Sequence, residues 1–185
     1  AFELGRSFVR PEYQRHYAPL LLLWKGIAKC IEKRPECPVL FGAVSISSDY
    51  HPLSRALIMN FMTGRMSGEL AEHVKARRSY RRPMVLPKHI KQLNSLVSTL
   101  DELSATVSDL ERDGKGVPVL LRHYLKIGGQ FLGFNVDSSF SNALDGLIFA
   151  DLRTVPGPML ERCMGKTGAA AFRAWHSDPA AKLTL

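Results

Sequence analysis

The spacing of apolar residues divides the chain into short strands and longer helices. Phe2, Leu4 and Phe8 share one parity, which predicts a strand over residues 2–9 that Pro11 ends. Apolar residues three and four apart then predict a helix from Pro11 to about Lys33. The run over 39–47 is nearly all apolar or small, as in a strand covered on both faces.

The rest of the chain continues this alternation of strands and helices. Ser48 or Asp49 is expected to cap a helix after the second strand. The pattern further predicts helices at about 67–76, within 88–110 and over 117–127, strands over 130–137 and 142–152, and two helices near 157–164 and 168–175, separated at Gly165. Four strands interleaved with helices indicate an α/β fold with a mixed or partly parallel sheet.

Composition agrees with one globular domain. The chain has 185 residues, of which 45% are hydrophobic and 23% charged, values that exclude a wholly disordered or low-complexity protein. Three cysteines without zinc-like spacing predict neither a disulfide framework nor a metal site. We see no leader peptide, and the apolar run over 17–31 is too short for a bilayer, so we expect a cytoplasmic protein.

The net charge of +8 suggests an anionic partner. A basic run, KARRSYRR over 75–82, lies in the segment 62–112, which we interpret as a helical and basic insertion with an exposed, mobile part at 75–82. Nucleic acid, anionic lipid and an acidic carrier protein all fit this charge. Because no known nucleic-acid-binding motif is present, we predict no nucleic-acid partner.

Four ordered stretches resemble one family, the hemolysin-type or ornithine-lipid-synthesis N-acyltransferases of the GCN5-related N-acyltransferase superfamily. They are ELGRSFVRPEYQRHYAPLLLLWKGI (3–27), VLFGAVSISSDYHPLSRALI (39–58), DGKGVPVLLRHYLKIGGQFLGFNVDSSFSNALDGLIFADL (113–152) and MGKTGAAAFRAWH (164–176). The superfamily fold normally places three strands ahead of the strand expected at 2–9. The resemblance therefore implies the carboxy-terminal part of a single acyltransferase-like domain over 1–185, completed by a missing amino-terminal segment or by a fused lysophospholipid-acyltransferase domain.

The resemblance also implies a reaction. It is the transfer of a (3-hydroxy)acyl group from an acyl-carrier-protein or acyl-CoA thioester to an amine such as ornithine, in aminolipid synthesis. The donor is then a substrate, and no tightly bound cofactor or metal is expected. The expected partners are acyl carrier protein, the amine acceptor and an anionic membrane surface on the inner face of the cytoplasmic membrane. The alternative is a non-catalytic module of the same fold that binds a carrier protein or a membrane surface.

Two groups of residues are candidates near the first expected strand. Glu3 and Arg6 are the candidate catalytic pair; the weakly similar acyl-homoserine-lactone synthases carry Glu-x-x-Arg at the matching strand. Glu3 would bind or deprotonate the amine, unless the two residues form a structural ion pair. The thioester arm is expected to contact the strand and the helix start that follows, where free N–H groups suit an anion, through Ser7, Phe8, Val9, Arg10 and Arg15.

A third group lies at the end of the second strand, where sites of α/β proteins often gather. Ser45, Ser47, Asp49 and Tyr50 are candidates for contacts to the acceptor or the thioester. Asp137 and Asp145 adjoin expected strands. We interpret them as turn formers rather than acids, because aspartate next to a strand more often has that role.

Overall fold

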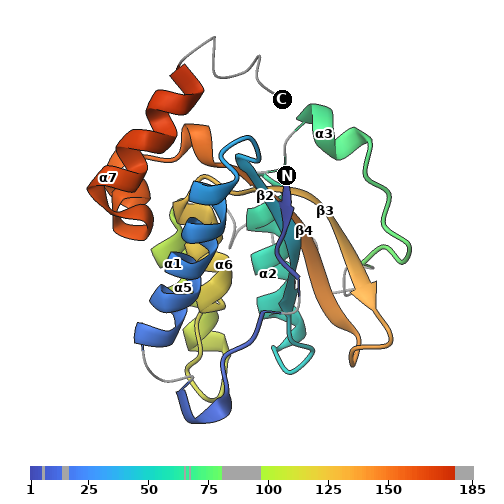
Figure 1. Ribbon diagram of the computed structural model, residues 1–185. Coiled ribbons are helices and arrows are strands. Elements are labelled where there is room, and N and C mark those ends of the chain that lie inside the picture. The colour runs from blue at the N-terminus through green and yellow to red at the C-terminus, as the bar shows by residue number, and fades with distance from the viewer. Residues whose placement is uncertain (6, 14–16, 65, 67, 81–96, 178–185) are drawn as a thin grey trace. The chain divides into compact units, whose positions relative to one another are not determined.

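The computed structural model describes residues 1–5, 7–13, 17–64, 66, 68–80 and 97–177 (Figure 1). Its four strands are β1 (Phe2–Glu3), β2 (Val39–Ile46), β3 (Gln130–Asp137) and β4 (Ala143–Asp151), and they form one sheet in the order β1-β2-β4-β3. β1 pairs parallel to β2, whereas β3 pairs antiparallel to β4. The prediction of an α/β fold with a mixed four-stranded sheet is confirmed.

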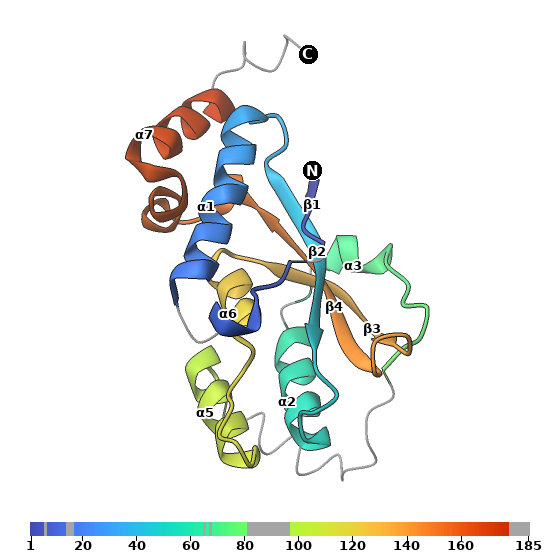
Figure 2. The same ribbon diagram turned by 60° about the horizontal axis from the view of Figure 1, so that its bottom comes forward.

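Helices separate β1 from β2 and β2 from β3, whereas β3 and β4 follow each other directly as a hairpin (Figure 2). The α-helices are α1 (Tyr17–Lys33), α2 (Pro52–Thr63), α3 (Gly68–Glu72), α5 (Leu100–Leu110), α6 (Val119–Lys126) and α7 (Gly157–Ser177), and two 3-10 turns are η1 (Pro11–Tyr13) and η2 (Leu152–Thr154). Gly165 interrupts α7 with a φ of 75°, a backbone conformation that favours glycine. The predicted break at this glycine is therefore confirmed.

The chain forms two compact units, residues 1–41 with 150–185, and residues 42–149. In the first unit α1 packs on α7, and each helix buries an apolar stripe. The buried residues of these stripes are Trp24, Ala28, Ile31, Leu160, Met164, Ala169 and Phe172. The expectation of one acyltransferase-like domain over 1–185 stays a prediction.

The second unit has its own apolar core. α2 packs against α5 and also contacts β3. The fully buried side chains include Leu57, Ile58, Met62, Leu103, Val107, Leu121, Phe131, Leu144 and Ile148. A capping box starts α5, because the Thr99 side chain accepts from Glu102 N while the Glu102 side chain accepts from Thr99 N.

The β3–β4 hairpin has one buried and one accessible face. Along β4 the even-numbered residues Leu144, Gly146 and Ile148 are buried, while the odd-numbered ones between them are half-buried. Asn135 lies opposite Asp145, so their side chains share the accessible face. Hairpin register therefore places polar side chains from both strands side by side.

Several element boundaries differ from those predicted. β1 covers two residues instead of 2–9: Leu4 N still donates to Phe41 O at 2.7 Å, and Gly5, a poor strand residue, follows. The helix expected from Pro11 begins as η1 and becomes α1 at Tyr17, with 14–16 outside the described residues. The helix expected over 67–76 is only α3, with residue 67 also outside the description.

The predicted cap of α2 is wrong. His51 is the N-cap, and its Nδ1 accepts from Leu53 N at 3.2 Å. Pro52 then occupies the first helical position, where its fixed φ suits a helix start and its missing N–H costs nothing. Asp49 instead accepts a hydrogen bond from the Ser47 hydroxyl at 2.8 Å.

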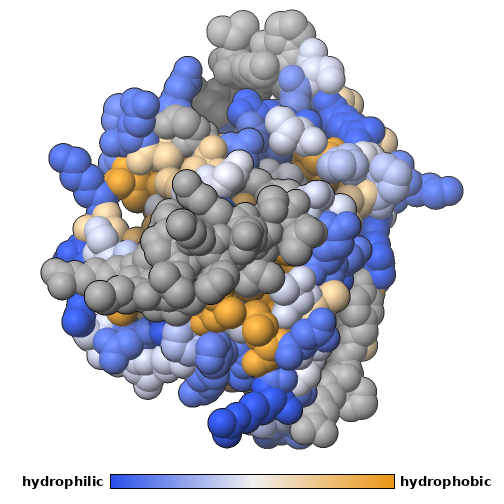
Figure 3. All heavy atoms as spheres, turned by 180° about the vertical axis from the view of Figure 1, so that it is seen from behind, coloured by the Kyte–Doolittle hydropathy of each residue, from blue (hydrophilic) through white to orange (hydrophobic). Residues whose placement is uncertain are grey.

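The surface seen in Figure 3 shows apolar patches separated by hydrophilic side chains. Among the described residues, no helix combines the length and the apolar character that a membrane crossing requires.

Gly146 provides a test of the hairpin packing. A Cβ at this position would lie 2.6 Å from Cε1 of Phe131, whose ring is fully buried and stacks on Phe134 at 5.2 Å. We expect Gly146→Ala to lower the free energy of unfolding by about 1–3 kcal/mol, because the buried ring has little room to move. Urea denaturation measures this loss. Gly133→Ala is the control, since its Cβ meets only Val74 Cγ1 at 3.3 Å; equal losses in both variants would contradict the argument.

Candidate functional site

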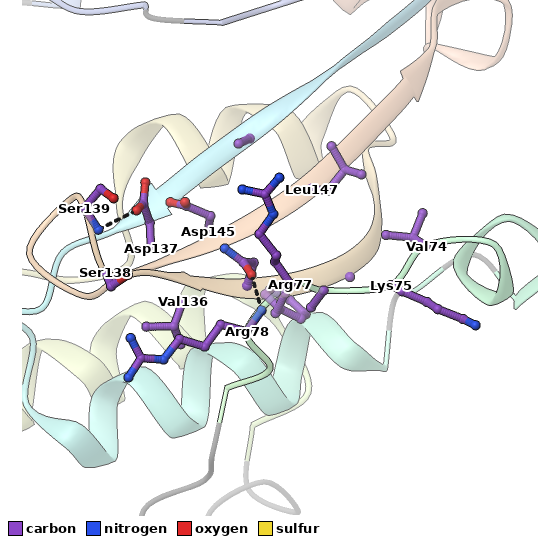
Figure 4. Close-up of a pocket in the computed structure, with 15 residues that line it drawn as sticks. Val74, Lys75, Arg77, Arg78, Val136, Asp137, Ser138, Ser139, Asp145 and Leu147 are labelled. Carbon is purple, nitrogen blue, oxygen red and sulfur yellow. Dashed lines mark hydrogen bonds between the residues drawn. The ribbon is translucent and has the colours of Figure 1, made fainter.

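A groove of about 680 Å³ lies on the accessible face of the second unit (Figure 4). β2 contributes Ala43, β4 contributes Asp145 and Leu147, and β3 contributes residues of 133–137. The segment 74–78, which follows α3, forms the opposite wall. The volume is in the range of small-molecule sites.

The basic wall is held in place by β3, through the backbone of Val136 and the side chain of Asn135. Val136 N donates to Arg78 O at 2.9 Å, and Arg78 N donates to Asn135 Oδ1 at 2.8 Å. Ser79 forms an antiparallel bridge with Asn135. Residues 75 and 77–79 are exposed, as expected, and 78–79 bond to β3. The expected mobility of 75–82 stays a prediction, and residues 81–82 lie outside the description.

The acidic side of the groove comes from the hairpin. Asp145 Oδ1 accepts a hydrogen bond from Ser45 Oγ at 2.6 Å, which links β4 to β2. Asp137 Oδ1 accepts from Ser139 N at 2.8 Å, at the start of the turn. The two aspartates are diagonal neighbours on one face, since Asp145 pairs with Asn135 and Asp137 with Ala143.

The cations of the wall take different directions. In Figure 4 the Arg77 side chain extends over the sheet on the side that carries Asp145, whereas Lys75 points away from the hairpin. Arg77 and Lys75 are both exposed. The groove thus offers a guanidinium donor and two carboxylate acceptors, a set that can bind and orient a small polar molecule.

Of the residues predicted at the end of β2, the structure brings only Ser45 to this groove, through Asp145. Ser47 and Asp49 are exposed and bond each other, with Ser47 Oγ also accepting from Asp49 N at 3.1 Å. Tyr50 is buried, and its hydroxyl donates to Gly116 O at 2.8 Å. Their contacts with an acceptor or thioester stay predictions.

The residues predicted near β1 lie in the first unit. Glu3 is exposed and faces Phe41 in the register of β1 and β2. Arg6 and Arg15 lie outside the described residues. Ser7, Phe8 and Arg10 are exposed and Val9 is half-buried, and Arg10 Nη2 pairs with Glu12 Oε1 at 2.5 Å.

Sequence reasoning missed three residues of the groove. Arg77 was assigned to a mobile run, while Asp137 and Asp145 were interpreted as turn formers. Asp137 does form a turn, since it bonds Ser139 N, but its side chain also lines the groove. The available signal was the pair Asn135 and Asp137, two residues apart on one expected strand, which places both side chains on one face.

Tyr50 anchors the loop that follows α5. The Lys115 Nζ lies 4.6 Å from the Tyr50 ring centroid and pairs with Glu111 and Asp113 at 3.6 and 3.4 Å. Burial, with a smaller contribution from the negative charges of Glu111 and Asp113, raises the pKa of Tyr50 to about 12. The neutral hydroxyl therefore remains a hydrogen-bond donor throughout the neutral range.

The first unit has a second groove, of about 580 Å³, beside the glycine-rich break of α7. Its lining includes Lys166, Thr167 and Gly168 at the start of the second half of the helix. Glu32 lies opposite: a Cβ on Gly168 would be 2.6 Å from Glu32 Oε1. A carboxylate at this place disfavours an anion, so the groove does not act as a phosphate loop.

Metal-ligating residues do not gather in the described part of the chain. No group of three or more His, Cys, Asp or Glu side chains there can hold a metal ion.

Comparison with known proteins leaves the family open. No family model matches the chain, and no curated protein or solved structure matches it at a significant level.

Removing the Tyr50 hydroxyl tests the loop anchor. We expect Tyr50→Phe to lower the free energy of unfolding by about 1 kcal/mol, because Gly116 O loses its donor. Above pH 10 the unfolded chain ionises this tyrosine while the folded protein keeps it protonated to about pH 12, so wild-type stability falls across that interval. The variant should lose less stability there. Burial also raises the pKa of Tyr124, but this effect is common to both proteins.

Denaturation curves at pH 8 to 12 measure both effects. Tyr13→Phe is the control, because it makes the same change at an exposed tyrosine. Identical pH dependence in wild type and Tyr50→Phe would show that the hydroxyl is not held as described.

Proposed function

We propose that the chain is an N-acyltransferase that moves a (3-hydroxy)acyl group from an acyl-carrier-protein or acyl-CoA thioester to an amine such as ornithine. The observation that supports this most directly is the hydrogen bond between Ser45 and Asp145, at 2.6 Å. Ser45 belongs to one stretch that resembles the family, 39–58, and Asp145 to another, 113–152. Two separate family-like stretches therefore meet at one polar groove, which fits an acceptor site.

The chemistry requires few protein groups. The amine nitrogen, once deprotonated, attacks the thioester carbonyl carbon; the C–S bond then breaks, and the thiol leaves with a proton. We assign the handling of the amine proton to Glu3 and the orientation of an acidic group to Arg6. The thioester arm would lie along Ser7 to Arg10, which belong to no helix or strand.

The partners that fit this reaction are an acidic carrier protein and an anionic membrane surface on the cytoplasmic side. The net charge of +8 favours both by long-range attraction. The donor thioester is a substrate, so the reaction needs no resident cofactor.

A second candidate is a non-catalytic module that binds a carrier protein or membrane surface. The observation that favours it is an exposed aromatic and basic segment: the side chains of Phe8 and Tyr13 are 81% and 51% exposed, with exposed Arg10 between them in the chain. Aromatic and basic side chains together suit the interface of an anionic membrane.

A thioester-release assay tests the enzyme proposal. The full-length polypeptide is incubated with a 3-hydroxyacyl carrier protein and ornithine, and free thiol and acylated amine are measured. We expect turnover in the wild type and a loss of at least about a hundredfold in kcat for Glu3→Gln, since proton handling contributes about this much. Glu161→Gln, an exposed change in the same unit, should leave the rate unchanged.

Two results would go against these assignments. Full turnover by the double variant Glu3→Gln, Arg6→Ala would overturn the roles of both residues. No turnover by the wild type, together with binding of carrier protein or anionic vesicles that Phe8→Ser weakens, would favour the non-catalytic module.

A further inference from the structure

The groove of the second unit carries charges of both signs that do not neutralise each other. Lys75, Arg77 and Arg78 line it together with Asp137 and Asp145. Within the described residues, no ion pair joins any of these cations to either aspartate. Charges that serve only solubility do not require a cavity between them. A site for a ligand with two opposite charges does require charges of both signs around one cavity.

The position of Arg77 is fixed by its neighbour. The backbone N–H and C=O of Arg78 both bond to β3, at 2.8 and 2.9 Å, so the start of the Arg77 side chain is held beside the hairpin. Figure 4 shows this side chain reaching over the sheet on the side of Asp145. A guanidinium in that position presents two parallel N–H donors, the geometry that suits a carboxylate.

The two aspartates provide the complementary half. Each has its Oδ1 engaged, in Asp145 by Ser45 Oγ and in Asp137 by Ser139 N, and both residues line the groove. Diagonal neighbours on one face of a hairpin lie close enough to share a ligand group. Two carboxylates together attract an ammonium group and repel an anion.

We propose that this groove binds a free α-amino acid, with its carboxylate on Arg77 and its amino group on Asp145 and Asp137. Ser45 acts as a positioning residue, because it holds the Asp145 carboxylate. The inference concerns binding by the second unit alone and rests on the proposed function only if the bound amino acid is the acyl acceptor; Glu3 and Arg6 have no part in holding it here. A nucleotide or phospholipid headgroup fits less well, because its phosphate would meet the two carboxylates.

Three related compounds test the proposal by isothermal titration calorimetry. L-Ornithine carries all the charges, 1,4-diaminobutane lacks only the carboxylate, and 5-aminopentanoate lacks only the α-amino group. We expect saturable binding of ornithine at one site and binding about tenfold weaker for each of the other two, because each loses one charge-assisted contact.

Two variants assign the charges to residues. In Arg77→Gln the advantage of ornithine over 1,4-diaminobutane should disappear, whereas its advantage over 5-aminopentanoate should remain. Asp145→Asn should do the reverse. A general structural effect would weaken all three compounds alike, so the selective loss identifies the contact. Arg112→Gln and Asp109→Asn, exposed changes of the same type in the same unit, should leave all three affinities unchanged.

The outcomes separate the binding site from the enzyme activity. Absence of ornithine binding, equal binding of all three compounds, or an unchanged selectivity in Arg77→Gln would each overturn the amino-acid site. Ornithine binding with the expected selectivity, but without acyl transfer, would support the site and count against the acyltransferase. Acyl transfer that is insensitive to both Arg77→Gln and Asp145→Asn would support the enzyme and place its acceptor elsewhere.

Discussion

The backbone groups along β3 are the constraint on which the polar groove depends. In the strand order β1-β2-β4-β3 this strand is at the edge, and unpaired N–H and C=O groups at a sheet edge need partners. Residues 78–79 supply them near Asn135, and Met66 forms a further bridge to Phe131. Pairing of this edge brings a basic segment alongside an acidic hairpin, and the cavity is the space left between them.

Strong local signals made much of the fold predictable. The bounds of β2 and β3 were predicted to within one residue. A shift of a strand by one residue would turn its apolar side chains away from the core, so the sequence allows little choice of register. Gly165 was recognised as a helix break because only glycine adopts its φ of 75° at little cost.

The site was harder to predict than the fold. The path of 74–80 depends on hydrogen bonds to Val136 and Asn135, more than fifty residues away, and no local pattern encodes such contacts. The N-cap of α2 is His51 instead of Ser48 or Asp49. Pro52 takes the first helical position, so the residue before it is the cap. The roles of Glu3 and Arg6 stay predictions, with Arg6 outside the described residues.

The attachment of the basic wall through the main chain has an evolutionary consequence. Arg78 joins β3 by its backbone N–H and C=O, and these groups are the same in nearly every amino acid. Side chains at 75, 77 and 78 can therefore be exchanged while the path of the wall is preserved. Related proteins with the same backbone could acquire different ligand preferences by point substitution at these positions alone, which separates the evolution of specificity from that of stability.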